Sequence, residues 1–175
     1  MIFNLKKSIQ ILERTPVVLY HLVQNLSQDW THNNEGADSW NVPDVIGHLI
    51  YCDTENWLLR TKHILNEGDS VPLPPFDRFA HLQLYQHHSL SQLVEQFKNT
   101  RESTLAEVRK LINNETDFNK KGLHPQFGEV VLSQLLSAWV VHDLSHHAQI
   151  NRIIAKQYSE TVGPWIQFLK ILNQP

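Results

Sequence analysis

The amino-acid sequence predicts an all-α fold, a bundle of three or four long helices joined by two long crossover connections. Apolar residues recur at three- and four-residue spacing along most of the chain, and no two-residue alternation persists, which is typical of amphipathic helices. Turn-forming residues interrupt this pattern at only a few places. With 175 residues the chain can form one packed core, so we expect a single domain over residues 1–175.

Capping and breaking residues set the expected helix limits. Thr15-Pro16 indicates a junction between two helices, with Thr15 as the N-cap and Pro16 at the first helical position. The Glu129-Val130-Val131 run could be extended instead of helical, which would leave the fold class unchanged. In chain order we expect helices over residues 5–26 with that junction, 41–67, 89–111 and 132–157, and a short C-terminal helix after Gly163.

Charge and composition exclude several classes of partner. The 15 basic and 18 acidic side chains give a net charge of −3, so nothing favours nucleic acid or an anionic membrane. No apolar run approaches the ~20 residues that span a bilayer. The N-terminus lacks the residue order of a secretory signal, and a single cysteine excludes an internal disulfide. We therefore expect a soluble cytoplasmic protein.

Histidine is the unusual residue, with eleven present. His142 and His146 are four residues apart, so on a helix they lie on one face, one turn from each other. The same stripe carries apolar residues such as Trp139 and Ile153, which predicts that both imidazoles point into the bundle. A shared metal ion would satisfy two buried neutral rings, whereas satisfied core histidines are the alternative. His147 projects about 100° away and is expected outside the site.

The best third ligand is His48, which lies in a stripe of the same spacing on the second long helix. Metal sites in helical bundles are built from inward side chains of facing helices. Three histidines leave coordination positions open for water or substrate, as in a catalytic site. The sequence therefore predicts a divalent transition-metal site formed by His48, His142 and His146.

Several neighbours of these histidines could assist them. Glu55 shares the stripe of His48 and is the candidate catalytic residue, as a general base, with a structural role equally open. For Cys52 we favour a small buried apolar residue over an additional ligand. Asp143 is expected to be solvated or to orient a histidine ring, and Gln149 could hydrogen-bond a ligand histidine or line the mouth of the site. Surface positions are expected for seven histidines: His21, His32, His63, His81, His87, His88 and His124.

Two segments resemble a known family. Residues 39–49 read SWNVPDVIGHL and are similar to the Trp-x(3–4)-(Glu/Asp)-Val-x-x-His-Leu segment of the DinB/YfiT-like superfamily. Residues 141–150 read VHDLSHHAQI and resemble its second signature, two histidines four apart with a following Gln. The resemblance implies an antiparallel four-helix bundle, usually a homodimer, with Ni²⁺ or Zn²⁺ bound by His48, His142 and His146.

That resemblance leaves three functions open. Characterised relatives include S-transferases that use a low-molecular-weight thiol, so the first hypothesis is a metal-dependent S-transferase acting on small molecules. The second is a metal-dependent hydrolase, in which a metal-activated water attacks the substrate and Glu55 serves as base. The third is a non-catalytic metal-binding stress-response module.

Overall fold

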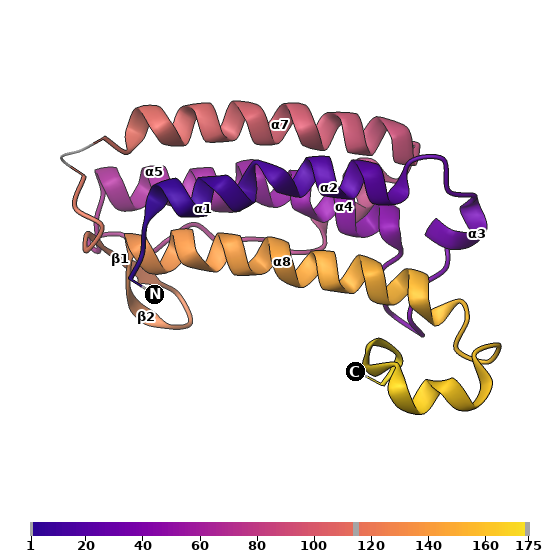
Figure 1. The fold of residues 1–175 in the computed structure, drawn as a ribbon. Helices are drawn as coiled ribbons and strands as arrows, with labels where there is room; N and C mark the ends of the chain where they lie inside the picture. Colours follow the sequence, from indigo (N-terminus) through magenta and orange to yellow (C-terminus); the bar gives the residue numbers. More distant parts are fainter. Residues whose placement is uncertain (1, 114–115, 174–175) are drawn as a thin grey trace.

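Four helical rods lie side by side in the computed structural model, which describes residues 2–113 and 116–173 (Figure 1). This arrangement confirms the expected all-α bundle. Within the described residues, no helix combines the length and the hydrophobicity that crossing a membrane needs. The rods are, in chain order, α1 (Leu5–Leu12) with α2 (Arg14–Val23); α4 (Val42–Cys52), the π-helix η1 (Asp53–Leu58) and α5 (Leu59–Asn66); α7 (Leu90–Leu111); and α8 (Leu132–Lys156).

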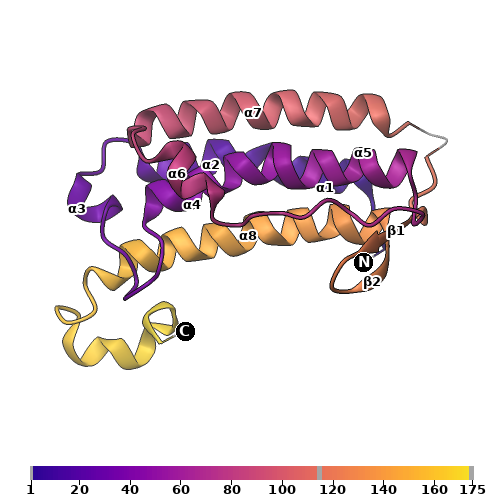
Figure 2. The same cartoon turned by 180° about the vertical axis from the view of Figure 1, so that it is seen from behind.

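Two rods run in one direction and two in the other (Figures 1 and 2). The chain leaves α5 and returns along the bundle through an extended crossover and the short helix α6 (Ala80–Tyr85) before α7 begins. This long return makes α7 parallel to α4–α5, while α8 is parallel to α1–α2. The crossover therefore brings α6 against α4.

Short elements close the ends of the bundle. The strands β1 (Lys121–His124) and β2 (Gly128–Val131) form an antiparallel hairpin, which confirms the extended alternative for residues 129–131. A Cβ atom at Gly122 would lie 2.7 Å from the side chain of Ile64, so only glycine allows the hairpin to pack this closely on α5. The remaining elements are α3 (Gln28–Thr31) and two 3₁₀ helices near the C-terminus, η2 (Gly163–Phe168) and η3 (Lys170–Leu172).

Two of the expected helix starts are confirmed and one is wrong. Asn41 and Asp44 form a reciprocal capping box at the start of α4, and Ser89 forms another at the start of α7. Thr15 is not an N-cap: α2 already begins at Arg14, and Glu13 occupies the N-cap position without a side-chain hydrogen bond. Buried Thr15 instead donates a hydrogen bond from its hydroxyl to the carbonyl of Ile11, so the turn continues across the junction.

The core consists of two hydrophobic clusters, one toward each end of the bundle. Leu12, Leu105 and Leu136 belong to the cluster nearer the hairpin, and Leu19 and Ile150 belong to the other. Each cluster combines residues from the same end of α1–α2 and of α8, as expected for two rods that run in the same direction. Buried charged residues interrupt the apolar packing between the clusters.

Arg101 is the centre of this buried polar layer. Its guanidinium donates to both oxygens of Asp53 at 2.7 and 2.9 Å and to both oxygens of Asp143 at 2.6 and 3.2 Å. It also donates to the carbonyl of Leu12 at 2.8 Å. All three charged side chains are at most 2% exposed. One arginine of α7 is thereby bound to α1, η1 and α8 at once.

We expect Arg101→Met to lower the free energy of unfolding by about 3–5 kcal/mol, because it leaves two buried carboxylates without their counter-charge. Urea unfolding followed by circular dichroism measures the change. Arg109→Met is the matched control on the same helix, since Arg109 pairs with Glu13 at the exposed surface. The control should cost less than about 1 kcal/mol. Equal losses for the two variants would contradict a special role for the buried layer.

Candidate metal centre

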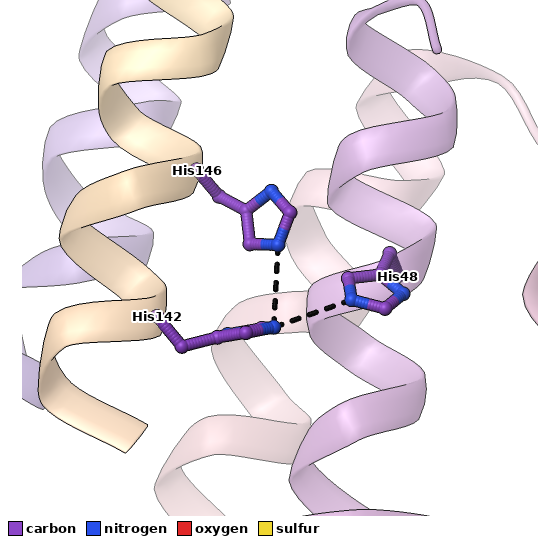
Figure 3. A group of neighbouring side chains, drawn as sticks. All are labelled: His48, His142 and His146. Carbon is purple, nitrogen blue, oxygen red and sulfur yellow. Dashed lines mark hydrogen bonds between the residues drawn. The ribbon is translucent and has the colours of Figure 1, made fainter. Parts of the chain in front are cut away.

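Three histidine side chains from two facing rods converge at one point (Figure 3). His48 projects from α4, and His142 and His146 project from successive turns of α8. The Nε2 atom of His142 is 3.2 Å from the Nε2 of His48 and 3.2 Å from the Nε2 of His146. The structure therefore brings the three sequence-predicted ligands together, with one ligand atom of each within 4.8 Å of the others.

The geometry of these nitrogen atoms fits a shared metal ion. Two imidazoles bound to a tetrahedral Zn²⁺ at 2.0–2.1 Å have nitrogens about 3.3 Å apart, close to the observed separations. Burial, followed by repulsion from the neighbouring histidines, lowers the pKa of His48 to about 2 and that of His146 to about 4. Both rings are therefore neutral at physiological pH and can offer a lone pair to a cation.

The hydrogen bond between His146 and Gln149 selects the tautomer that metal binding requires. Gln149 Oε1 lies 2.7 Å from His146 Nδ1, and a carbonyl oxygen can only accept, so Nδ1 carries the proton. The lone pair of this ring is then on Nε2, the atom that faces His142. Of the two roles that the sequence left open for Gln149, the structure supports hydrogen bonding to a ligand histidine.

Cys52 lies beneath the cluster, one helical turn from His48. Its Sγ is 3.3 Å from His48 Nε2 and 3.9 Å from His142 Nε2, and the residue is 1% exposed. Burial, reinforced by the carboxylates of Asp53 and Asp143, raises the pKa of the thiol, so the side chain is neutral. It packs within a hydrophobic cluster as a small buried side chain.

Asp143 is buried, which corrects the expectation of a solvated side chain. It is 0% exposed and paired with Arg101. Its Oδ1 is 4.0 Å from His142 Nδ1, too long for a hydrogen bond. Burial alone would raise the pKa of Asp143, but the charge of Arg101 together with hydrogen bonding from neighbouring side chains outweighs burial, and the net shift is downward. The carboxylate is therefore committed to Arg101 and is not a free base.

Glu55 does not point into the bundle, contrary to expectation. The π-helix η1 adds a residue to the turn, so the inward stripe passes from Cys52 to Asn56 instead of Glu55. Asn56 is 6% exposed, whereas the Glu55 side chain is exposed. The assigned general base is thus not among the residues that gather at the three histidines. An ordinary α-helical period was the wrong assumption at this position.

His81 is a functional candidate that sequence reasoning missed. It was expected at the surface but is 1% exposed on α6, with its ring 4.9 Å from the ring of His48 and 4.6 Å from that of Trp40. Neither of its ring nitrogens has a hydrogen-bond partner among the described residues. Burial lowers the pKa of His81, against the smaller opposing effects of the Asp44 carboxylate and the Arg78 backbone. In the sequence, His81 is not at a metal-ligand spacing from the other histidines, because only the crossover brings α6 beside α4.

The other histidines are distributed much as expected. Half-buried His147 lies outside the three-histidine cluster. Four of the remaining six are exposed and two are half-buried: His21, His32, His87 and His88, and His63 and His124 respectively.

Comparisons with known proteins agree with this architecture. A family model described as the DinB superfamily matches residues 11–150. Among solved structures, YfiT from Bacillus subtilis aligns with a TM-score of 0.71 over 86% of each chain at 24% sequence identity. That protein is described as a probable metal-dependent hydrolase with an unusual four-helix bundle topology. At this identity the likeness supports the fold. Comparison with curated proteins gives no significant match.

We expect the metal-free protein to lose stability as the pH falls from about 7 toward 4. Folded His48 and His146 have pKa values of about 2 and about 4, against ~6.5 when unfolded, so in this window the unfolded state binds more protons. Chemical unfolding of chelator-treated protein across this pH range measures the effect. His146→Gln should flatten the dependence, whereas exposed His87→Gln should leave it unchanged; identical profiles for both variants would argue against burial of a neutral His146.

Proposed function

The chain belongs to the DinB superfamily, and from that premise we propose that it is a metal-dependent enzyme acting on small molecules. The three converging histidines carry the proposal, because neutral imidazoles from two rods offer one shared point to a cation. Ni²⁺ or Zn²⁺ is the proposed ion, since imidazole suits both. When bound, such an ion supplies Lewis acidity that lowers the pKa of a coordinated thiol or water.

The reaction we favour is transfer to or from a small thiol. Activating a thiol requires much less help than activating water, because a free thiol has a pKa of about 8.5 and bulk water one of about 15.7. No described carboxylate is placed as a free base at the histidines: Asp53 and Asp143 are bound to Arg101, and Glu55 is exposed. A thiol-dependent S-transferase is therefore the function that best suits the described residues.

A metal-dependent hydrolase is the second candidate, and two observations favour it. The structurally similar YfiT is described as a probable hydrolase of this kind. His81 also lies beside His48, and burial lowers its pKa, so its neutral ring could accept a proton from water. His81 replaces Glu55 as the base in this alternative. A non-catalytic metal-binding module and a homodimer stay predictions, which turnover assays and analytical ultracentrifugation would test.

Removing one ligand tests the metal site. We expect His142→Ala to abolish stoichiometric binding of Ni²⁺ or Zn²⁺, because His142 Nε2 is central to both short nitrogen contacts. Metal content after dialysis and the metal-induced rise in melting temperature are the measurements. His147→Ala is the matched control on the same helix, next to His146, and should retain the metal. A wild-type metal content in His142→Ala would overturn the site.

The two reactions are separated by spectroscopy and by a substrate panel. If the favoured reaction is right, adding a small thiol to the Co²⁺-substituted protein should produce a thiolate-to-metal absorption band. The variant Glu55→Gln should then turn over a thiol and an electrophile at a rate within about twofold of wild type. Ester, amide and phosphoester hydrolysis without thiol, lost in His81→Gln, would instead establish the hydrolase. Absence of any thiol-dependent spectral change would count against the transferase.

A further inference from the structure

A cavity of about 500 Å³ lies beside the histidine cluster, a size typical of small-molecule sites. It is bounded by η1 and α5, by the β-hairpin, and by the first half of α8. Apolar side chains form much of its wall, among them Leu73, Val130 and Leu135. The wall also includes polar, aromatic and small side chains: Asn56, Trp57, Arg60, His124, Glu129 and Ala138.

Arg60 is a half-buried cation in the wall of this cavity. Its guanidinium donates to the carbonyl of Pro74 at 3.0 Å and lies 3.4 Å from the Nε2 of His124. Both partners are neutral, because burial and the charge of Arg60 lower the pKa of His124. The Nε atom of Arg60 is buried and has no hydrogen-bond partner among the described residues.

No carboxylate of the described residues forms an ion pair with Arg60. Glu129, the acidic side chain in the same wall, pairs with Lys121 at 2.9 Å. Removing a guanidinium from water without a counter-charge is costly, and burial accordingly lowers the pKa of Arg60. An anion entering the cavity would supply the missing counter-charge.

The cavity shares a wall with the histidine cluster. The Trp57 ring lines the cavity and meets the His142 ring edge-on, with centroids 5.1 Å apart. The π-helix creates this connection, because its extra residue shifts Asn56 and Arg60 into the places that an α-helix would give to Glu55 and Leu59.

We propose that this cavity binds a small molecule with an apolar body and one oxyanion, and that Arg60 receives the oxyanion. A carboxylate and a phosphate monoester share the required chemistry, since both accept paired hydrogen bonds from a guanidinium. The apolar body lies against Leu73, Leu135 and the Trp57 ring. Identifying this ligand as the substrate rests on the proposed function, because only then does the shared Trp57 wall direct it toward a reactive metal.

Calorimetric titration with three probes of one shape tests the binding site: 2-naphthylacetate, 2-naphthyl phosphate and neutral 2-naphthylacetamide. We expect at least one anion to bind roughly tenfold more tightly than the amide, and the tighter anion identifies the headgroup. The titrations use the full-length protein as purified and again after chelation, so that direct coordination of the anion to a metal is excluded. Equal affinity for all three probes, or no binding of any, overturns the proposal.

Variants then locate the site. Arg60→Gln should remove the preference for the anions, whereas Arg14→Gln, a matched change at an exposed position of α2, should retain it. Ala138→Phe should block all three probes by filling the cavity while Arg60 stays in place. Wild-type preference in Arg60→Gln, or wild-type affinity in a folded Ala138→Phe, overturns the assignment. If Arg60→Gln fails to fold, two other results decide the proposal. These are the preference of the wild-type protein for the anionic probes and the loss of probe binding in Ala138→Phe.

Metal content and anion binding, measured on the same samples, distinguish the Arg60 site from the proposed metal-dependent function. Metal content is measured in Arg60→Gln and should equal that of wild type, because Arg60 is not one of the three histidine ligands. Loss of anion preference with metal retained supports the Arg60 site. Arg60-dependent anion binding in a protein that never binds metal would leave the Arg60 site standing and refute the metal-dependent function alone.

Discussion

The buried pairing of Arg101 with Asp53 and Asp143 is the constraint on which the rest of the structure depends. Three charges removed from water are tolerated only when their hydrogen bonds are satisfied, and here five donor contacts, the fifth to the Leu12 carbonyl, satisfy them. These contacts fix the axial positions of α1, η1, α7 and α8 relative to one another. A shift of one helix by one turn would leave a buried charge unpaired.

The same network positions the candidate metal centre. Asp53 follows Cys52 directly, one turn beyond His48, and Asp143 follows His142 directly. Anchoring the two aspartates to one arginine therefore holds the second and fourth rods at the separation where His48 and His142 meet. Apolar packing is adaptable by comparison, whereas the paired charges accept one arrangement. His48 and His146 then bring neutral rings to the site, so these two side chains add no charge repulsion to it.

The π-helix η1 determines which side chains lie next to the histidines. By adding one residue to a turn it moves Glu55 to the surface and gives the inner wall to Asn56, Trp57 and Arg60. The wall next to the histidines consequently carries Asn56 and the cation Arg60, where the α-helical pattern would have supplied Glu55 and Leu59. The carboxylate base that the sequence pattern predicted is therefore lost, and the ligand that we propose for this wall is an anion.

Sequence patterns alone were sufficient to predict the helical rods and the grouping of the three histidines. Helical periodicity and capping residues such as Asn41 and Ser89 act within a few residues, so they can be recognised without knowing the fold. The His142 and His146 pair is equally local, and His48 followed from the inward stripe of its helix. Membership of the family was visible in the same two segments.

Tertiary structure decided the remaining features, because each depends on groups far apart in the chain. The burial of Asp143 requires Arg101, which is 42 residues away, and the burial of His81 requires a crossover that returns along the bundle. The π-turn that displaces Glu55 is a one-residue change of register within an otherwise regular helical pattern. Local propensity determined which segments are helical and where the histidines face; long-range charge pairing and packing determined which polar side chains accompany them.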